Sequence, residues 1–171
     1  AIALGILGAV RQYKVDDHIS TTLAYVFYAT PVFVLGILIK DFFAIKVNNA
    51  IGHTVLYTVG DNTPGFTGSW SATMLDDVEH AALPVLTLVL VSYAAWSRYQ
   101  RASLLDVLNS DYVRFARAKG LSRRRVLIRH ALRNALIPIT TVIALDFAAV
   151  IGGAVITEIV YGWEGMGRLL L

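Results

Sequence analysis

Three long apolar segments, residues 19–39, 81–97 and 135–160, constrain the fold of this chain more than any other feature. A helix rises about 1.5 Å per residue, so each segment can cross a hydrocarbon core of about 30 Å, the shortest with help from flanking residues. None alternates apolar and polar residues as a barrel strand does. With 56% hydrophobic and 16% charged residues, the 171-residue chain is predicted to be an all-α polytopic membrane protein.

Each apolar segment contains one proline, and each is still expected to form a helix. Pro31 lies in the middle of residues 19–39, where a membrane helix tolerates it if neighbouring helices or hydroxyl groups take up the freed carbonyl. Pro84 is expected in the first turn of its helix, where no intrahelical donor is lost, and Pro138 near the start of the third.

Positive charge is gathered in one part of the chain. Residues 98–133 contain ten Lys and Arg and two acids, whereas residues 41–80 contain one basic residue and five acids. Loops rich in Lys and Arg stay in the cytoplasm, so the first region is predicted to be cytoplasmic and the second external.

These signals divide 1–171 into parts of one transmembrane domain. The predicted parts are the end of a membrane helix at 1–10, a cytoplasmic loop at 11–18, a membrane helix at 19–45, an external loop at 46–80, a membrane helix at 81–101, a cytoplasmic loop at 102–134, a membrane helix at 135–160 and an external loop at 161–171. Ten apolar residues are about half of what a span needs, so we expect a piece of a longer chain, with about three full spans plus part of another.

The basic loop contains residues that typically begin and end two helices. Asp111 is predicted to cap a short helix that Gly120 ends, and Ser122 to cap a second helix that continues into the membrane. The second helix should carry two stripes, an apolar one of Leu127, Ile128, Ala131, Leu132 and Ala135 and a basic one of Arg125, Arg129 and Arg133.

Three functions fit such a loop. It can be an ordinary positive-inside loop, solvated by water and anionic headgroups. A nucleic-acid patch is the weakest reading, because Tyr112 and Phe115 are the only aromatic residues nearby and no recognition motif accompanies them. The third is a docking element that transmits force from a cytoplasmic partner, since long ordered loops usually have a function.

The loop also carries family motifs, "ARAKGL" at 116–121 and "RHALRNALIP" at 129–138. With "TPVFVLGILI" at 30–39 and "GGAVITEIVYGWEGMGRLL" at 152–170, they make the chain resemble the inner-membrane permease subunits of binding-protein-dependent ABC importers, most closely the dipeptide and oligopeptide type. The loop corresponds to that family's EAA motif, but Arg114, Phe115 and Ala116 stand where Glu-Ala-Ala would, while Gly120 is kept.

The resemblance implies roles for the loop. In that family its short helix sits in a groove of a cytoplasmic ATPase and moves when ATP closes the nucleotide-binding dimer. The implied ATPase-coupling residues are Tyr112, Arg114, Phe115, Ala116, Arg117, Ala118, Lys119, Gly120 and Leu121, and the implied loop scaffold is Arg125, Arg129, His130, Arg133, Asn134 and Pro138.

The resemblance also implies six spans in the complete protein and a bacterial inner-membrane location. The implied partners are a second homologous permease, two cytoplasmic ATPase subunits, an external substrate-binding protein and the lipid bilayer, with no nucleic acid. The chain is expected to have no catalytic residue, metal or cofactor, with ATP and Mg on the ATPase subunits.

The expected cargo is di- or oligopeptides. Nickel or glutathione is the nearest alternative, and an ion channel or secondary carrier is the alternative from a different class.

The third apolar segment holds the candidate residues of a translocation path: Asp146, Gly152, Gly153 and Glu158. Burying the Asp146 charge in lipid costs at least about 2.5 kcal/mol, so it should face protein or water. It either lies on the path or makes a structural hydrogen bond to a neighbouring helix. Ala148 and Ala149 precede the two glycines at i+4 spacing, which predicts close helix packing. The family resemblance implies that Glu158, at the outer end of this segment, is a gate or a structural residue.

Overall fold

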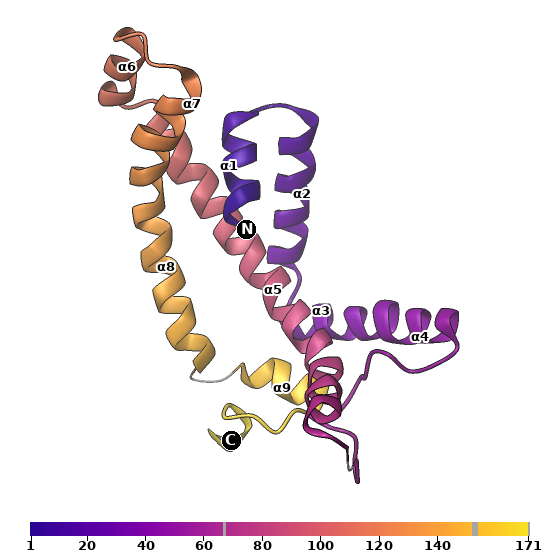
Figure 1. Ribbon diagram of the computed structural model, residues 1–171. Helices are drawn as coiled ribbons and strands as arrows, with labels where there is room; N and C mark the ends of the chain where they lie inside the picture. Colours follow the sequence, from indigo (N-terminus) through magenta and orange to yellow (C-terminus); the bar gives the residue numbers. More distant parts are fainter. Residues whose placement is uncertain (67, 152–153, 171) are drawn as a thin grey trace. The chain divides into compact units, whose positions relative to one another are not determined.

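The computed structural model describes residues 1–66, 68–151 and 154–170, which form helices joined by loops, with no strand among them (Figure 1). The all-α prediction is therefore confirmed. The helices are α1 Ile2–Val10, α2 Val15–Ala29, α3 Val32–Ile39, η1 Lys40–Ile45, α4 Lys46–Ile51, α5 Trp70–Leu108, α6 Asp111–Ala118, α7 Arg123–Arg125, η2 Val126–Leu132, α8 Arg133–Ile151, α9 Val155–Tyr161 and η3 Arg168–Leu170. The segments η1 and η2 are π-helical, and η3 is a 3₁₀ turn.

Two of the described helices, 70–108 and 123–150, are long and apolar enough to cross a membrane. The first predicted span differs from expectation, because it is broken at Pro31 into α2 and a second helix, 32–51, and the two pass the same test only as a pair. Pro31 is extended, with φ −56° and ψ 139°. Proline donates no backbone N–H and disfavours the helical conformation of the residue before it, so Thr30 and Pro31 interrupt the helix.

Helix α5 is longer than the predicted span. It begins at Trp70 and ends at Leu108, so it takes in the end of the predicted external loop and the start of the predicted basic loop. Pro84 consequently lies in the interior of the helix and not in its first turn, which corrects the sequence-based expectation.

The chain forms two compact units, and α5 contributes to both. The first consists of residues 1–28 and 92–147. Its core joins α1, α5, α6, η2 and α8 through mostly small residues: Ala9, Leu104, Val113, Ala116, Val126, Ala131 and Ala135. A Cβ at Gly5 of α1 would lie 2.6 Å from the carbonyl oxygen of Ser97 in α5, so the two backbones touch. Small residues permit this close packing.

The second unit consists of residues 29–91 and 148–171. Helix α3 packs on α9, where a Cβ at Gly36 would lie 3.0 Å from Val160 Cγ1. The buried Tyr161 hydroxyl shares a hydrogen bond with Thr87 (2.7 Å) and lies 3.2 Å from the Gly36 carbonyl oxygen. These contacts join α3, α5 and α9.

The loop between α4 and α5 is tied down by side chains. Asn48 Oδ1 accepts the N–H groups of Val55 and Leu56, and Asp76 accepts the N–H and the hydroxyl of Thr63 at 2.8 and 2.6 Å. The predicted external loop 46–80 is therefore partly helical and held by specific hydrogen bonds.

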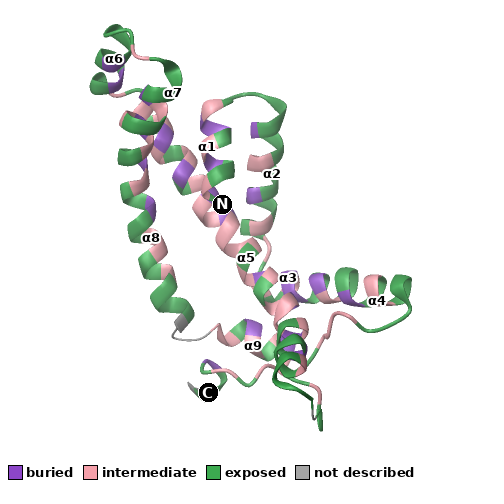
Figure 2. Cartoon of the chain, in the orientation of Figure 1, coloured by how far each residue is buried: buried purple, intermediate pink, exposed green. Residues whose placement is uncertain are grey.

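Exposed residues occur along many helices, as the green stretches of Figure 2 show, and many of them are large and apolar. Leu23 of α2 is 45% exposed, Val89 of α5 55% and Leu145 of α8 68%. Water-facing helices bury such residues, whereas helices covered by lipid or by other spans leave them on the outside. The burial pattern agrees with a membrane protein.

Candidate functional site

The short helix α6 begins at the expected place with a different cap. Its N-cap is Ser110, and Asp111 is the first helical residue, so the prediction of an Asp111 cap was wrong. The Ser110 hydroxyl donates to the Val107 carbonyl oxygen at the end of α5 and makes no cap bond to α6. Ser110 is extended, with ψ 153°, which lets the chain turn between the two helices.

Gly120 forms the corner after α6, as predicted. Its φ is +76°, and its N–H donates to the Arg117 carbonyl oxygen at 3.0 Å. A Cβ placed there would meet no atom within 4 Å, so the left-handed backbone alone favours glycine. Ser122 is the next N-cap, as expected, although its side chain makes no cap bond.

One face of α6 belongs to the core of the first unit. Val113 is fully buried and Ala116 is 7% exposed, and both pack with Leu104 of α5 and Val126 of η2. The predicted coupling residue Ala116 therefore faces the core, and Leu121 also packs against it. The spacing of Val113 and Ala116, three residues apart on a helix, is the signal that sequence reasoning missed.

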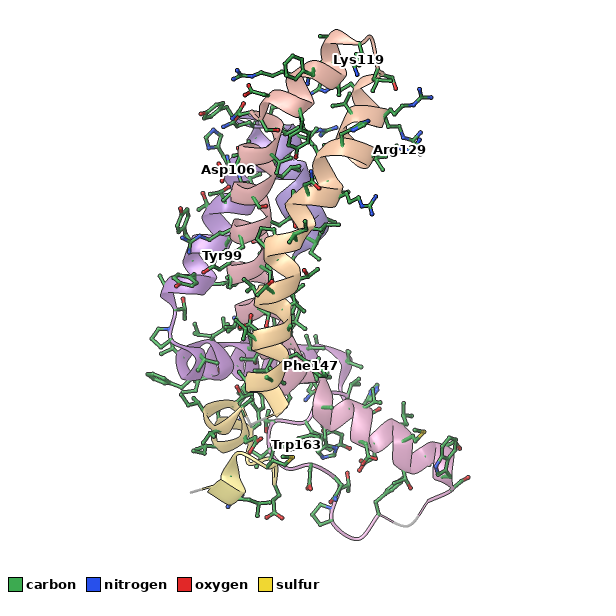
Figure 3. All side chains as sticks on the ribbon, turned by 90° about the vertical axis from the view of Figure 1, so that its left-hand side faces the viewer. Tyr99, Asp106, Lys119, Arg129, Phe147 and Trp163 are labelled. Atoms are coloured by element: carbon green, nitrogen blue, oxygen red, sulfur yellow. The ribbon has the colours of Figure 1, made fainter. Side chains whose placement is uncertain are left out.

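The other face of α6 is open. Tyr112 is 41% exposed and Phe115 68% exposed, and the remaining predicted coupling residues on this surface are Arg114, Arg117, Ala118, Lys119 and Gly120. Figure 3 shows Lys119 at the turn beyond α6 and Arg129 on the helix that follows. An exposed aromatic and basic face on a helix with a buried underside suits the docking of another protein.

Hydrogen bonds join α8 to α6 and to α5 beside the predicted loop scaffold. Asn134 Nδ2 donates to the Tyr112 hydroxyl at 2.9 Å, and Ser103 of α5 donates to the Ala135 carbonyl oxygen at 2.9 Å. The basic stripe of Arg125, Arg129 and Arg133 is exposed, as predicted, whereas His130 is partly buried and Pro138 is exposed inside α8.

The apolar stripe is confirmed at Ala131 and Ala135, which are buried, but it differs at its start because η2 is a π-helix. Val126 and Ala131 are buried, five residues apart, and Ala135 and Ile139 continue the buried face. Ile128, predicted to lie on the stripe, is 52% exposed. A π-helix bonds i to i+5, so it shifts the buried register by about one residue relative to a 3.6-residue period. π-Helical turns are frequent at functional sites.

Asp146 of α8 has a partner within the first unit. The Trp96 indole N–H of α5 donates to its carboxylate. This contact supplies the hydrogen bond that the structural reading of Asp146 requires. The other candidate path residues lie in the second unit or, for Gly152 and Gly153, outside the described residues.

Glu158 organises the loop that follows α9. Its carboxylate accepts the backbone N–H groups of Gly167 at 3.2 Å and Arg168 at 2.7 Å. A Cβ at Gly165 would lie 2.5 Å from this carboxylate, so the glycine makes room for it. Of its two expected roles, Glu158 has the contacts of a structural residue.

Asp17 and Arg101 form the ion pair that sequence reasoning did not identify. Arg101 Nε and Nη2 donate to the two carboxylate oxygens at 2.8 Å each, and the Tyr13 N–H adds a bond of 3.0 Å. Asp17 is 3% exposed and precedes the predicted span. The hydrogen bonds from Arg101 lower the pKa of Asp17 from 3.8 to about 2, although burial of the carboxylate acts in the opposite direction. Eighty-four residues separate the pair, so no local pattern reveals it.

Comparison with known proteins agrees with these features. The family model for the binding-protein-dependent transport system inner membrane component matches residues 1–171. The chain is 44% identical over 171 residues to the oligopeptide transport system permease protein OppB of Mycobacterium tuberculosis (99% of this chain, 52% of that protein). It is 36% identical over 181 residues to the dipeptide transport system permease protein DppB of Escherichia coli K12 (99% and 53%), and 38% over 170 residues to that organism's glutathione transport system permease protein GsiC (99% and 49%).

The chain belongs to the family of inner-membrane components of binding-protein-dependent transport systems. This membership confirms the resemblance seen in the sequence and the inner-membrane location. The chain spans about half the length of the curated relatives it matches.

Proposed function

We propose that the chain is part of a permease subunit of an ATP-driven ABC importer, which forms a translocation path for di- or oligopeptides with a second permease. Two cytoplasmic ATPase subunits bind and hydrolyse ATP with Mg, and an external binding protein delivers the substrate. This chain contributes no catalytic group. Its role is to carry movement from the ATPase subunits to the spans through residues 111–134.

The observation that carries this proposal is the two-sided packing of α6. Val113 and Ala116 anchor one face in the core, while Tyr112 and Phe115 remain exposed on the other. A displacement applied to the exposed face passes through tightly packed residues into α5 and α8, because close-packed interiors deform little. Both of these helices are long and apolar enough to span a membrane.

Peptides are the preferred cargo because the named relatives include oligopeptide and dipeptide permeases. The glutathione relative supports a second candidate, glutathione, which is itself a small peptide. Nickel remains a further alternative within this kind of permease. The external binding protein is expected to make most of the choice, since a path between two permeases contacts many substrates weakly.

Site-directed cross-linking tests the coupling role. A cysteine replaces Phe115 in the full-length permease, which is co-expressed with its ATPase subunits in membranes. We expect Phe115→Cys to cross-link to an ATPase subunit and the yield to change when ATP is added. The matched control is Leu145→Cys, which is equally exposed but lies within a predicted span.

Two results would contradict the proposal. One is a cross-link from Phe115→Cys only to lipid or to the permease itself. The other is ATP hydrolysis by the purified complex that neither short peptides nor glutathione accelerate in the presence of the binding protein.

A further inference from the structure

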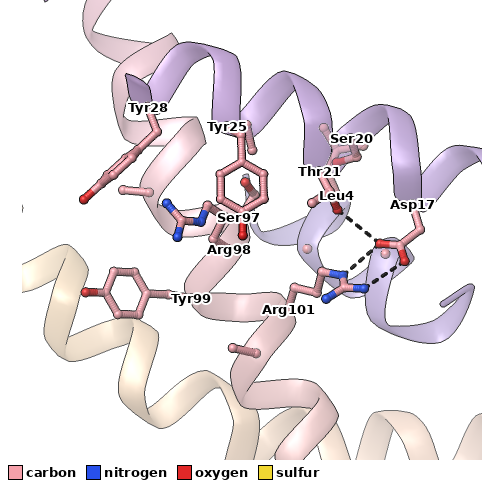
Figure 4. Close-up of a pocket in the computed structure, with 15 residues that line it drawn as sticks. Leu4, Asp17, Ser20, Thr21, Tyr25, Tyr28, Ser97, Arg98, Tyr99 and Arg101 are labelled. Atoms are coloured by element: carbon pink, nitrogen blue, oxygen red, sulfur yellow. Dashed lines mark hydrogen bonds and ion pairs between the residues drawn. The ribbon is translucent and has the colours of Figure 1, made fainter. Parts of the chain in front are cut away.

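The first unit contains a cavity of about 380 Å³ between α1, α2 and the second half of α5 (Figure 4). Its lining includes two arginines, Arg98 and Arg101, and one acid, Asp17. Tyrosines Tyr25 and Tyr28 of α2 form part of its wall. The coupling loop and the candidate path residues do not line it, so the cavity needs a separate explanation.

The cavity carries one positive charge that no described acid neutralises. Asp17 and Arg101 use both carboxylate oxygens in their paired hydrogen bonds, so they offset each other. Arg98 lies 4.5 and 4.7 Å from the ring centroids of Tyr25 and Tyr28, and among the described residues no carboxylate lies within ion-pair distance of it. Cation–π contacts orient a guanidinium without cancelling its charge.

A buried hydroxyl also lacks a partner. Ser97, which lines the cavity beside Arg98, is 4% exposed, and its Oγ has no hydrogen-bond partner among the described residues. Leaving such a group unpaired destabilises a protein. A negatively charged ligand with several acceptor oxygens would pair with Arg98 and bring an acceptor close to Ser97, and this is the chemistry of a phosphate group.

We propose that this cavity binds the phosphate headgroup of an anionic phospholipid. Arg98 directly follows the apolar segment 81–97 and precedes the basic loop, which places it at the predicted level of the cytoplasmic headgroups. This leaflet contains anionic lipids. Tyr25 and Tyr28 are 53% and 63% exposed, and tyrosine rings prefer the boundary between acyl chains and headgroups. A phospholipid would contact both the Arg98 guanidinium and the two tyrosine rings, whereas free phosphate would contact only the guanidinium.

Lipid retention by the full-length permease, purified in mild detergent, tests the proposal by native mass spectrometry. The protein is equilibrated with phosphatidylglycerol or with phosphatidylcholine. We expect the wild type to retain phosphatidylglycerol in preference, and Arg98→Gln to reduce that retention about five-fold. The control Arg124→Gln removes an exposed arginine elsewhere in the same unit and should leave retention unchanged.

Four outcomes would overturn the inference. They are equal retention of the two lipids by the wild type, equal losses in Arg98→Gln and Arg124→Gln, displacement of the lipid by millimolar inorganic phosphate, and displacement by a short peptide, which would indicate a carboxylate site. The wild-type comparison of lipids decides the question even if Arg98→Gln fails to fold. The inference does not depend on the proposed ATPase coupling, so a negative cross-linking result would leave it standing.

Discussion

At the scale of single residues, Asp17 and Arg101 form a two-bond ion pair whose acid is buried. Asp17→Ala leaves the Arg101 guanidinium, 27% exposed, without its partner. Removing one member of a buried pair costs about 3–5 kcal/mol, and the partial exposure of Arg101 puts this case at the lower end. We expect a lower thermal unfolding temperature in detergent, measured by intrinsic tryptophan fluorescence.

The control is the double variant Asp17→Ala/Arg101→Met, which removes both charges and should recover part of the loss. Because folding lowers the Asp17 pKa to about 2 from its usual 3.8, the stabilisation is complete above about pH 5 and is lost as the pH falls towards 2. A constant difference between wild type and Asp17→Ala from pH 7 to pH 3 would contradict this account.

Asp146 gives a second prediction at this scale. Asp146→Asn keeps an oxygen that accepts the Trp96 indole N–H, so stability and uptake should change little. Asp146→Leu leaves that donor unpaired and should destabilise the protein by about 1–2 kcal/mol. Thermal unfolding and peptide uptake measured on both variants separate the two roles. If Asp146→Asn lowers the uptake of positively charged peptides and of no others, Asp146 lies on the translocation path after all.

Sequence reasoning identified some of these polar side chains and missed others for a physical reason. Asp146 was found because a charge inside an apolar segment is costly and therefore conspicuous. Asp17 was missed because it lies in a polar stretch, where an acid is unremarkable, and its partner is 84 residues away. Glu158 was noticed through family resemblance, but only the structure shows that it accepts the backbone N–H groups of Gly167 and Arg168.

At the scale of elements, the corner after α6 depends on one backbone conformation. Gly120→Val forces a β-branched residue to φ +76°, which costs about 1–2 kcal/mol although no atom blocks the side chain. We expect the permease to be inserted at normal levels while ATP-driven uptake falls several-fold. Gly120→Asn is the matched control, because asparagine tolerates this conformation, and it should retain uptake. Equal uptake by both variants would exclude the corner from coupling.

The loop after α9 depends on a single carboxylate. Glu158→Ala removes the acceptor for two N–H groups and should loosen residues 164–168, so trypsin should cleave the purified permease faster after Arg168. Glu164→Ala removes only an exposed pair of 3.9 Å with the same arginine, and cleavage should stay near the wild-type rate. Similar rates for the two variants would show that the Glu158 bonds do not order the loop.

Two helix boundaries in the basic loop were predictable from the sequence, whereas helix continuity and register were not. Gly120 and Ser122 marked their boundaries correctly because glycine and serine act through the local backbone. The break at Pro31 was underestimated, since a membrane helix can also tolerate proline. The π-helical turn in η2 could not be recognised from the sequence, because a stripe of apolar residues is identified on the assumption of 3.6 residues per turn.

At the scale of the whole molecule, the two compact units differ in the sign of their net charge. Residues 1–28 and 92–147 contain twelve basic and five acidic residues, a net charge of +7. Residues 29–91 and 148–171 contain three basic and seven acidic residues, a net charge of −4. The charge asymmetry of the loops therefore extends to the two units, and both predicted cytoplasmic loops, 11–18 and 102–134, belong to the basic unit, as the rule for Lys- and Arg-rich loops expects.

Cysteine labelling tests that orientation directly, because these 171 residues contain no cysteine. Ser122→Cys and Asn62→Cys are introduced singly into a full-length permease from which any other cysteines have been removed. Both positions are exposed and outside the long apolar helices or at their ends, so labelling reports access from one side and not burial. In intact cells a membrane-impermeant maleimide should label Asn62→Cys at once and Ser122→Cys only after the membrane is broken. Labelling of Ser122→Cys from outside, with or without labelling of Asn62→Cys, would contradict the predicted orientation and remove the basic loop from reach of any cytoplasmic ATPase.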